Sequence, residues 1–319
     1  MGYYVPPKIL RNSDLEKMVD TSNEWITTRT GIKQRRIAEP DVSTSLLGYR
    51  AAKKALRDAG ITAREIDLII VATTTQDMFF PSTACIIQQK LRAKGAAAFD
   101  IAAACCGFIF ALNTAYHYVL AGTYQRVLVV AAEVLSKVVD WTDRNTCVLF
   151  GDGAGACVVG KVRTGGILSS YMASDGTWKD LLEIPAGGSR MPASHLTVDE
   201  RLHYIKMRGN EVFKLAVKMM AEAGNKAVAL AGIECRDIDC VIPHQANYRI
   251  INATASRLGI DLKKVYMNVN KYGNMSSAST VVALTEAVKK GRIRKGDRVL
   301  LVAFGSGLVW SSMVLEWSR

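Results

Sequence analysis

Apolar residues recur along this chain in two patterns. Over residues 45–59 they return every three or four positions, which predicts an amphipathic helix that ends before Gly60. The apolar face of this helix consists of Leu46, Leu47, Ala51, Ala55 and Leu56. Short uninterrupted apolar runs at 67–73 and 239–243 predict strands that are covered on both faces. Buried strands that alternate with helices predict an α/β protein with parallel strand pairing.

The chain repeats itself at an offset of 172 residues. Residues 59–67 read AGITAREID and residues 231–239 read AGIECRDID, so six of these nine positions are identical. The same offset recurs without a gap where RVLVV, starting at Arg126, aligns with RVLLV, starting at Arg298. A single offset that holds over this distance predicts two copies of one α/β unit.

We place the two copies at residues 1–165 and 166–319. No Gly/Ser-rich linker separates them, so we expect the halves to share an interface. In doubly wound α/β proteins, ligands bind at the carboxyl ends of the strands. The sequence therefore predicts a site where corresponding strand ends of the two halves meet.

Composition excludes several classes of protein. A hydrophobic fraction of 49% in 319 residues excludes a largely disordered chain. No apolar stretch approaches the length of a membrane span, and no signal peptide precedes the first motif, so we expect a cytoplasmic protein. The seven cysteines form no CxxC pair, which argues against a metal site or a disulfide framework. The net charge of +12 fits an anionic partner such as CoA or an acidic carrier protein, but the densest basic run, at 289–295, is also typical of a solvated helix C-terminus. No pattern of basic and aromatic residues supports nucleic-acid binding.

Three segments carry residues suited to catalysis. Cys105 lies where an Ala-rich strand meets a helix, and the N-terminus of that helix favours a thiolate; a buried structural cysteine is the alternative. His244 directly follows a buried strand, and Asn274 lies in a Gly-Asn turn, so each also has a structural interpretation. The repeat aligns Cys105 with Ser277, three residues from Asn274. This alignment favours a shared pocket over three separate structural roles.

Six motifs occur in an order and spacing that resemble one family. They are DTSNEWITTRTGIKQRRIA (20–38), AAACCGF (102–108), FGDGAGA (150–156), GNEVFK (209–214), PHQAN (243–247) and GNMSSAS (273–279). Through them the chain resembles ketoacyl-acyl carrier protein synthase III, a member of the thiolase-fold superfamily, over essentially its whole length. The resemblance implies a thiolase-like α/β fold, with two duplicated halves and mixed, mainly parallel sheets in α-β-α-β-α layers.

The resemblance also implies the roles of individual residues. Cys105 is the implied nucleophile, with His244 and Asn274 as its partners, and the backbone N–H groups of Cys105 and Ser306 form the implied oxyanion hole. The other implied contacts are Trp25, Arg29, Arg144, Asn210 and Asn247 with CoA; Lys214, Arg249 and Arg257 with the carrier protein; and Phe80, Leu135, Phe150 and Met207 with the acyl group.

The implied reaction is a decarboxylating Claisen condensation that initiates fatty acid synthesis. A short acyl-CoA, acetyl-CoA in the first place, would react with malonyl-acyl carrier protein to give 3-oxoacyl-carrier protein, CoA and CO2. No metal or redox cofactor is expected, because the CoA thioester is itself a substrate. The family also implies a homodimer, in which Phe80 closes the neighbouring subunit's acyl pocket.

Two alternatives remain open. One is an enzyme of the same fold that uses another acyl donor or acceptor, such as a starter synthase or an ester-forming acyltransferase. The other is a non-catalytic partner subunit that binds the carrier protein, against which the intact Cys105, His244 and Asn274 argue.

Three positions depart from the family pattern. The chain begins almost at Tyr3, so the first strand of the family is expected to be missing or cut short. Ser306 replaces a residue that is usually Gly, although its backbone N–H remains available. Cys106 replaces a residue that is usually Ala, which puts a second thiol beside the nucleophile.

Overall fold

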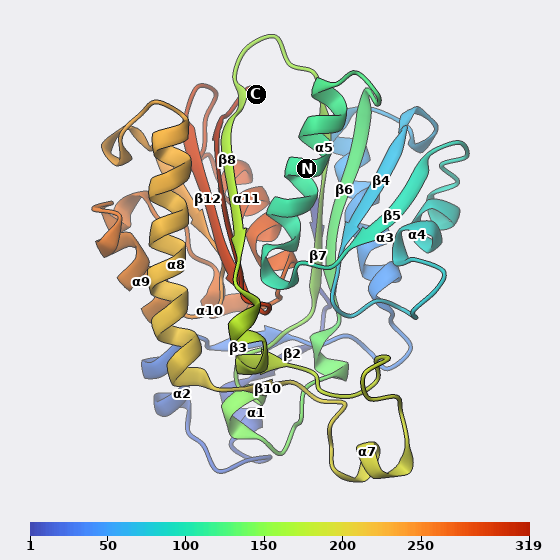
Figure 1. The fold of residues 1–319 in the computed structure, drawn as a ribbon, viewed down its shortest axis with the longest axis vertical. Helices are drawn as coiled ribbons and strands as arrows, with labels where there is room; N and C mark the ends of the chain where they lie inside the picture. Colours follow the sequence, from blue (N-terminus) through green and yellow to red (C-terminus); the bar gives the residue numbers. More distant parts are fainter.

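The computed structural model describes residues 1–319 as two β-sheets with helices between them and outside them (Figure 1). The strands of the first sheet are β1 (Gly2–Tyr4), β4 (Leu68–Ala72), β5 (Ala97–Ile101), β6 (Arg126–Glu133) and β7 (Gly153–Gly160), in the order β1-β7-β6-β4-β5. The strands of the second are β8 (Gly166–Ser174), β11 (Cys240–Pro243), β12 (Arg298–Gly305) and β13 (Val309–Glu316), in the order β11-β12-β13-β8. Two small antiparallel pairs join β2 (Ile9–Arg11) to β3 (Gln34–Arg36) and β9 (Leu182–Glu183) to β10 (Lys206–Met207).

Both large sheets are mixed. Strand β4 pairs in parallel with β5 and β6, and β11 pairs in parallel with β12. The remaining pairs, on the β1 side of the first sheet and the β8 side of the second, are antiparallel. The buried apolar runs therefore form the parallel part of each sheet, as the hydrophobic pattern predicts.

Helices cover both sheets and fill the space between them. They are α1 (Asn12–Leu15), α2 (Asn23–Thr30), α3 (Thr44–Ala59), α4 (Thr83–Leu91), α5 (Gly107–Leu120), α6 (Arg144–Cys147), α7 (His195–Asp199), α8 (Gly209–Leu230), α9 (Tyr248–Arg257), α10 (Val269–Tyr272) and α11 (Ala278–Lys289). Helices α3 and α4 pack on the outside of the first sheet and α8 on the outside of the second, with α9 beside it, while α5 and α11 lie between the sheets (Figure 1). This is the α-β-α-β-α layering that the resemblance implies, and the fold-class prediction is confirmed.

Corresponding hydrogen bonds make the internal repeat visible. The Asp67 carboxylate accepts a hydrogen bond from the Arg126 backbone N–H at 2.9 Å, and 172 residues later Asp239 accepts one from Arg298 at 2.8 Å. Each bond joins the residue before one strand, β4 or β11, to the start of the parallel strand beside it, β6 or β12. The halves diverge after this point, because α10 occupies the sequence position that corresponds to β5.

The sequence-based expectation was that the first strand is missing or cut short, and the structure shows it present with three residues. Strand β1 pairs with the edge strand β7, with Gly2 opposite Ala156. A Cβ atom on Gly2 would lie 2.4 Å from the backbone nitrogen of Ala55, so only glycine allows helix α3 to pack this closely. Three residues therefore suffice to extend the sheet. No helix of the chain is both long enough and apolar enough to cross a membrane.

Candidate active site

Cys105 lies in a 3₁₀ turn between strand β5 and helix α5. The turn covers Ala104–Cys106, and Ala104 has a left-handed backbone with φ of 44°. Gly107 begins the helix and packs closely, since a Cβ atom there would lie 3.0 Å from Ala72 Cβ and 3.3 Å from Ser277 Cβ. The turn therefore presses the start of the helix against both halves of the protein, and Cys105 is 8% exposed.

His244 follows strand β11 and is almost completely buried. Its backbone N–H donates to Val302 O at 2.8 Å, and the amide of Gln245 donates to the carbonyls of Pro243 and Tyr266, which holds the loop in place. Both ring nitrogens of His244 are buried and have no hydrogen-bond partner in the chain. Because buried polar groups are rarely left unpaired, the ring is arranged to bind a ligand.

Asn274 presents its amide N–H₂ group to the same place. Its backbone N–H donates to Leu149 O at 2.9 Å, and its side-chain Oδ1 accepts from Ser276 N at 2.8 Å. These two bonds fix the orientation of the side chain. Since Oδ1 is occupied, Nδ2 remains as a donor with no acceptor in the protein.

The structure brings the three residues together. Cys105, His244 and Asn274 all line one cavity of about 110 Å³, together with Phe150 and Met207. An adjoining cavity of about 260 Å³ is also lined by Cys105 and Phe150, and by Leu135 and Ser306. Three segments that are far apart in the sequence thus meet at one site.

Phe80 lies outside both cavities and is 85% exposed. Its neighbours Met78 and Phe79 are also exposed, so the segment forms an uncovered apolar surface. Phe80 is therefore not a core residue of its own chain.

Burial favours the neutral thiol of Cys105 and the neutral imidazole of His244 over a thiolate–imidazolium ion pair. Burial raises the pKa of the Cys105 thiol from 9.0 to about 12, against a smaller lowering by the Ser276 hydroxyl. Burial lowers the pKa of His244 from 6.5 to about 4, which leaves the imidazole neutral. Desolvation of Cys105 thus opposes the thiolate that the helix N-terminus was expected to favour.

Two backbone donors converge beside Cys105. Neither the Cys105 N–H nor the Ser306 N–H has an acceptor within the chain. Gly305 comes so close that a Cβ atom on it would lie 2.7 Å from Cys105 N. The hydroxyl of Ser306 donates to Leu182 O, which directs this side chain toward strand β9 and leaves the backbone group as the donor at the site.

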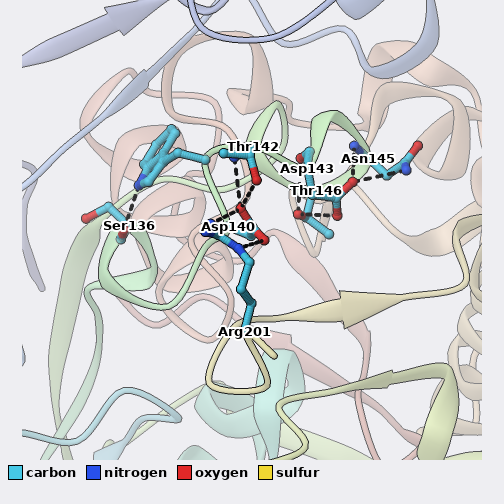
Figure 2. Close-up of polar contacts among 8 residues, drawn as sticks. Ser136, Asp140, Thr142, Asp143, Asn145, Thr146 and Arg201 are labelled. Carbon is cyan, nitrogen blue, oxygen red and sulfur yellow. Dashed lines mark hydrogen bonds and ion pairs between the residues drawn. The ribbon is translucent and has the colours of Figure 1, made fainter. Parts of the chain in front are cut away.

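Cationic and aromatic side chains cluster at helix α2. The guanidinium groups of Arg29 and Arg144 both stack on the Trp25 ring, at 4.8 and 4.9 Å from its centroid. Arg144 also donates to the backbone carbonyl of Asp20 at 2.7 Å. Asp143 caps the short helix α6 that carries Arg144, through bonds to Asn145 and Thr146 that Figure 2 shows.

Of the other predicted site residues, one lines the cavity and the rest are exposed on helices α8 and α9. Asn247 lines the cavity of Cys105, and its amide caps α9 and donates to Arg29 O at 3.1 Å. Asn210 is exposed at the start of α8 and does not line either cavity. Lys214 on α8 and the two arginines Arg249 and Arg257 on α9 are exposed cations on neighbouring helices.

Comparison with known proteins gives the family of this chain. Residues 99–176 match the family model 3-oxoacyl-[acyl-carrier-protein] synthase III, and residues 228–317 match the C-terminal model of the same family. The β-ketoacyl-[acyl-carrier-protein] synthase III of Caldanaerobacter subterraneus is 59% identical, over 100% of this chain and 96% of that protein. This chain belongs to the β-ketoacyl-[acyl-carrier-protein] synthase III family. It is an acyltransferase and a condensing enzyme.

Another sequence relative and a solved structure belong to the same family. The β-ketoacyl-[acyl-carrier-protein] synthase III of Clostridioides difficile is 52% identical over 100% of this chain and 97% of that protein. The crystal structure of the Aquifex aeolicus 3-oxoacyl-[acyl-carrier-protein] synthase III has a TM-score of 0.92 and 48% identity, and the match covers 99% of this synthase and 98% of that chain. The family and fold inferred from the six sequence motifs are therefore confirmed.

The sequence analysis missed a buried carboxylate beside the site. Glu133, at the end of strand β6, is completely buried and accepts hydrogen bonds from five donors in Thr73, Thr74, Thr75 and Ser277. Thr74 and Thr75 line the 260 Å³ cavity. A single acidic residue at the carboxyl end of an apolar strand was the signal that could have identified it.

Cys106 is directed away from the site. It is completely buried, and its thiol donates to the backbone carbonyl of Val309 at 3.4 Å. Burial raises the pKa of this thiol well above its ordinary value. Cys106 lines neither cavity, so the second thiol is a packing residue in this fold.

Proposed function

We propose that this synthase transfers a short acyl group, acetyl in the first place, from CoA to Cys105. It then condenses that group with malonyl-acyl carrier protein to give 3-oxoacyl-carrier protein, CoA and CO2. The observation that carries the proposal is the shared cavity of Cys105, His244 and Asn274, in which both His244 ring nitrogens lack a partner. Neither a metal ion nor a redox cofactor takes part in the proposed steps.

The first half-reaction acylates Cys105. Its sulfur attacks the thioester carbonyl of acyl-CoA, and a new carbon–sulfur bond forms. The unpaired N–H groups of Cys105 and Ser306 stabilise the negative charge on the tetrahedral oxygen. The bond to the CoA sulfur then breaks, and the Cys105 proton leaves with CoA as its thiol.

The second half-reaction removes CO2 from the malonyl thioester. His244 and the free Nδ2 of Asn274 donate hydrogen bonds to the thioester oxygen, where the electrons of the broken carbon–carbon bond collect as an enolate. The neutral imidazole implied by the lowered pKa of His244 suits this role as a donor. The enolate carbon then attacks the acyl-Cys105 carbonyl, the carbon–sulfur bond breaks, and the cysteine sulfur takes a proton from water to restore the thiol.

We assign the CoA nucleotide to the cluster at α2. The Trp25 face can stack on the adenine ring, and the guanidinium groups of Arg29 and Arg144 can pair with phosphates. Asn247, in the cavity wall, and Asn210, at its outer edge, are the proposed pantetheine contacts. Leu135, Phe150 and Met207 line the two cavities and are the proposed acyl contacts.

We assign the carrier protein to the exposed cations of α8 and α9. Lys214, Arg249 and Arg257 project from two helices that pack against each other, and Arg249 stacks on Phe213 at 5.5 Å. The net charge of +12 supports an acidic partner at such a surface.

We propose a homodimer in which Phe80 completes the neighbouring subunit's acyl pocket. The exposed Met78, Phe79 and Phe80 support this, because neighbouring exposed apolar residues of this size mark interaction surfaces. Light scattering at micromolar concentration tests the assembly. A mass near that of one 34.8 kDa chain would contradict it.

Two further proposals concern the division of the chain into halves and its cellular compartment. We propose that the chain consists of two halves: residues 1–165 carry the nucleophile, and residues 166–319 carry His244 and Asn274. The seven free thiols support a reducing compartment such as the cytoplasm.

Intact-mass analysis tests the proposed reaction. The protein is incubated with a panel of acyl-CoAs, and malonyl-carrier protein is added afterwards. We expect an acyl mass increase that peptide mapping places on Cys105 and that disappears on condensation. Acylation by a long or branched donor alone would favour a starter synthase, and retention of the label after malonyl-carrier protein is added would favour an acyltransferase with another acceptor.

A further inference from the structure

Residues 184–205 leave the body of the protein and return to it at one point. Strand β9 before this excursion pairs with strand β10 after it, with Leu182 opposite Met207. The excursion contains helix α7, which Figure 1 places at the lower edge of the molecule, away from both large sheets. It is not stabilised by a sheet of its own, so its position depends on its attachments to the rest of the chain.

Only two polar contacts outside the stem attach the excursion to the rest of the chain, and both go to the same loop. Arg201 donates to Asp140 through Nε at 2.8 Å and through Nη2 at 2.6 Å. The Ile205 N–H donates to Val138 O at 2.9 Å. One side-chain ion pair and one backbone bond therefore link the excursion to residues 138–140.

Asp140 is suited to a fixed ion pair. It is 5% exposed, and its carboxylate also accepts from the Thr142 backbone N–H at 2.9 Å and from the Thr142 hydroxyl at 2.6 Å, as Figure 2 shows. The paired geometry with Arg201 fixes both the distance and the direction of the guanidinium. Arg201 itself has a left-handed backbone, with φ of 56°.

The linked segments line one cavity together. The loop before Asp140, strand β9 and the two ends of the excursion all line the 260 Å³ cavity beside Cys105. The lining residues are Leu135 and Val138 from the loop, Leu182 and Glu183 from β9, and Ile184 and Ile205 from the excursion. Because Val138 and Ile205 are hydrogen-bonded neighbours, a contact that holds the excursion against the loop also holds this part of the cavity wall in place.

We propose that Asp140 and Arg201 are positioning residues that set the width of the acyl cavity and so determine which acyl groups Cys105 accepts. The proposal rests on the proposed function in one respect, that this cavity receives the acyl group. Without the ion pair, the base of the excursion is still held by the β9–β10 pairing, the backbone bond to Val138 and the burial of Ile205, but the part beyond this base is released and the wall can relax outward. A wider cavity admits longer chains and holds a two-carbon group less well.

Acylation of Cys105 by acetyl-CoA and by octanoyl-CoA, measured by intact mass in the full-length protein, tests this proposal. We expect Asp140→Asn and Arg201→Gln each to raise the ratio of octanoyl to acetyl rates about tenfold, with Arg201→Lys in between because it cannot form both bonds. Lys179→Gln removes the exposed ion pair with Asp180 and serves as the control, with no expected change. Equal loss of both rates, or an unchanged ratio, would overturn the proposal.

A second readout does not require CoA. Methyl and octyl methanethiosulfonates convert the Cys105 thiol to mixed disulfides of two lengths, which peptide mapping detects. We expect the same two variants to favour octyl labelling. If the wild type accepts no acyl-CoA, the proposed function fails, but the labelling ratio still tests whether the Asp140–Arg201 ion pair sets the width of the cavity. If the wild type is acylated and neither ratio changes in the variants, the proposed function holds and only the proposed role of the Asp140–Arg201 ion pair is wrong.

Discussion

Ala104 and Ser276 stand 172 residues apart and share a left-handed backbone, with φ of 44° and 46°. Both line the 260 Å³ cavity; Ala104 directly precedes Cys105, and Ser276 lies two residues after Asn274. A left-handed conformation costs an ordinary L-residue about 1–2 kcal/mol, so the surrounding packing must hold both. The internal repeat thus supplies one strained turn from each half of the protein, and the two turns lie beside Cys105 and Asn274.

Cys105 should behave as a thiol of high pKa in the resting enzyme. Because burial raises its pKa to about 12, the thiolate fraction grows about tenfold per pH unit throughout the range of about pH 6 to 9. We expect the rate of iodoacetamide alkylation at Cys105, followed by peptide mapping, to rise in this way without levelling off. A plateau near neutral pH would show that the helix N-terminus lowers the pKa after all.

His244 should reduce stability in acid. Its pKa is about 6.5 when unfolded and about 4 when buried, so the unfolded state takes up a proton first as the pH falls. The contribution is fully present above pH 6.5 and is lost on the way down to about pH 4, at a cost on the order of 3 kcal/mol. Urea unfolding at several pH values should show a smaller acid loss in His244→Gln than in wild type. Identical pH profiles would contradict the neutral buried ring.

Arg249→Glu should impair the reaction with malonyl-carrier protein about tenfold and leave acylation by acyl-CoA nearly unchanged. Exposed charges of this kind act mainly on the rate of encounter with an oppositely charged partner, and salt screens them. The two half-reactions are measured separately at low and high salt, with Arg236→Glu, an exposed arginine outside α8 and α9, as the matched control. Equal losses in both half-reactions, with no change in salt dependence, would mean that Arg249 is structural.

Glu133→Gln should lower the free energy of unfolding by about 2–4 kcal/mol, because the five donors that surround Glu133 match a carboxylate and the amide adds two more. Urea unfolding at neutral pH measures this, with the exposed Glu222→Gln as control. Burial raises the pKa of Glu133, which favours the protonated carboxyl. Unchanged stability of the variant would identify that state.

The family, the repeat and the three central residues could be read from the sequence because each rests on local patterns. Helix and strand periodicity and motifs such as PHQAN depend on neighbours only a few positions away, and the 172-residue offset is visible because two short local segments repeat. Cys105, His244 and Asn274 could be placed together because the repeat relates the corresponding strand ends.

Only the tertiary structure decided the charge of Cys105, the attachment of Arg201 to Asp140 and the burial of Glu133. The thiol's pKa depends on how completely water is excluded from the turn, which no local pattern records. Asp140 and Arg201 are 61 residues apart, and surface loops of this kind carry no periodic signal that would predict their pairing. Local propensity thus determined the elements and the catalytic motifs, whereas desolvation and long-range contacts determined the chemistry of the site.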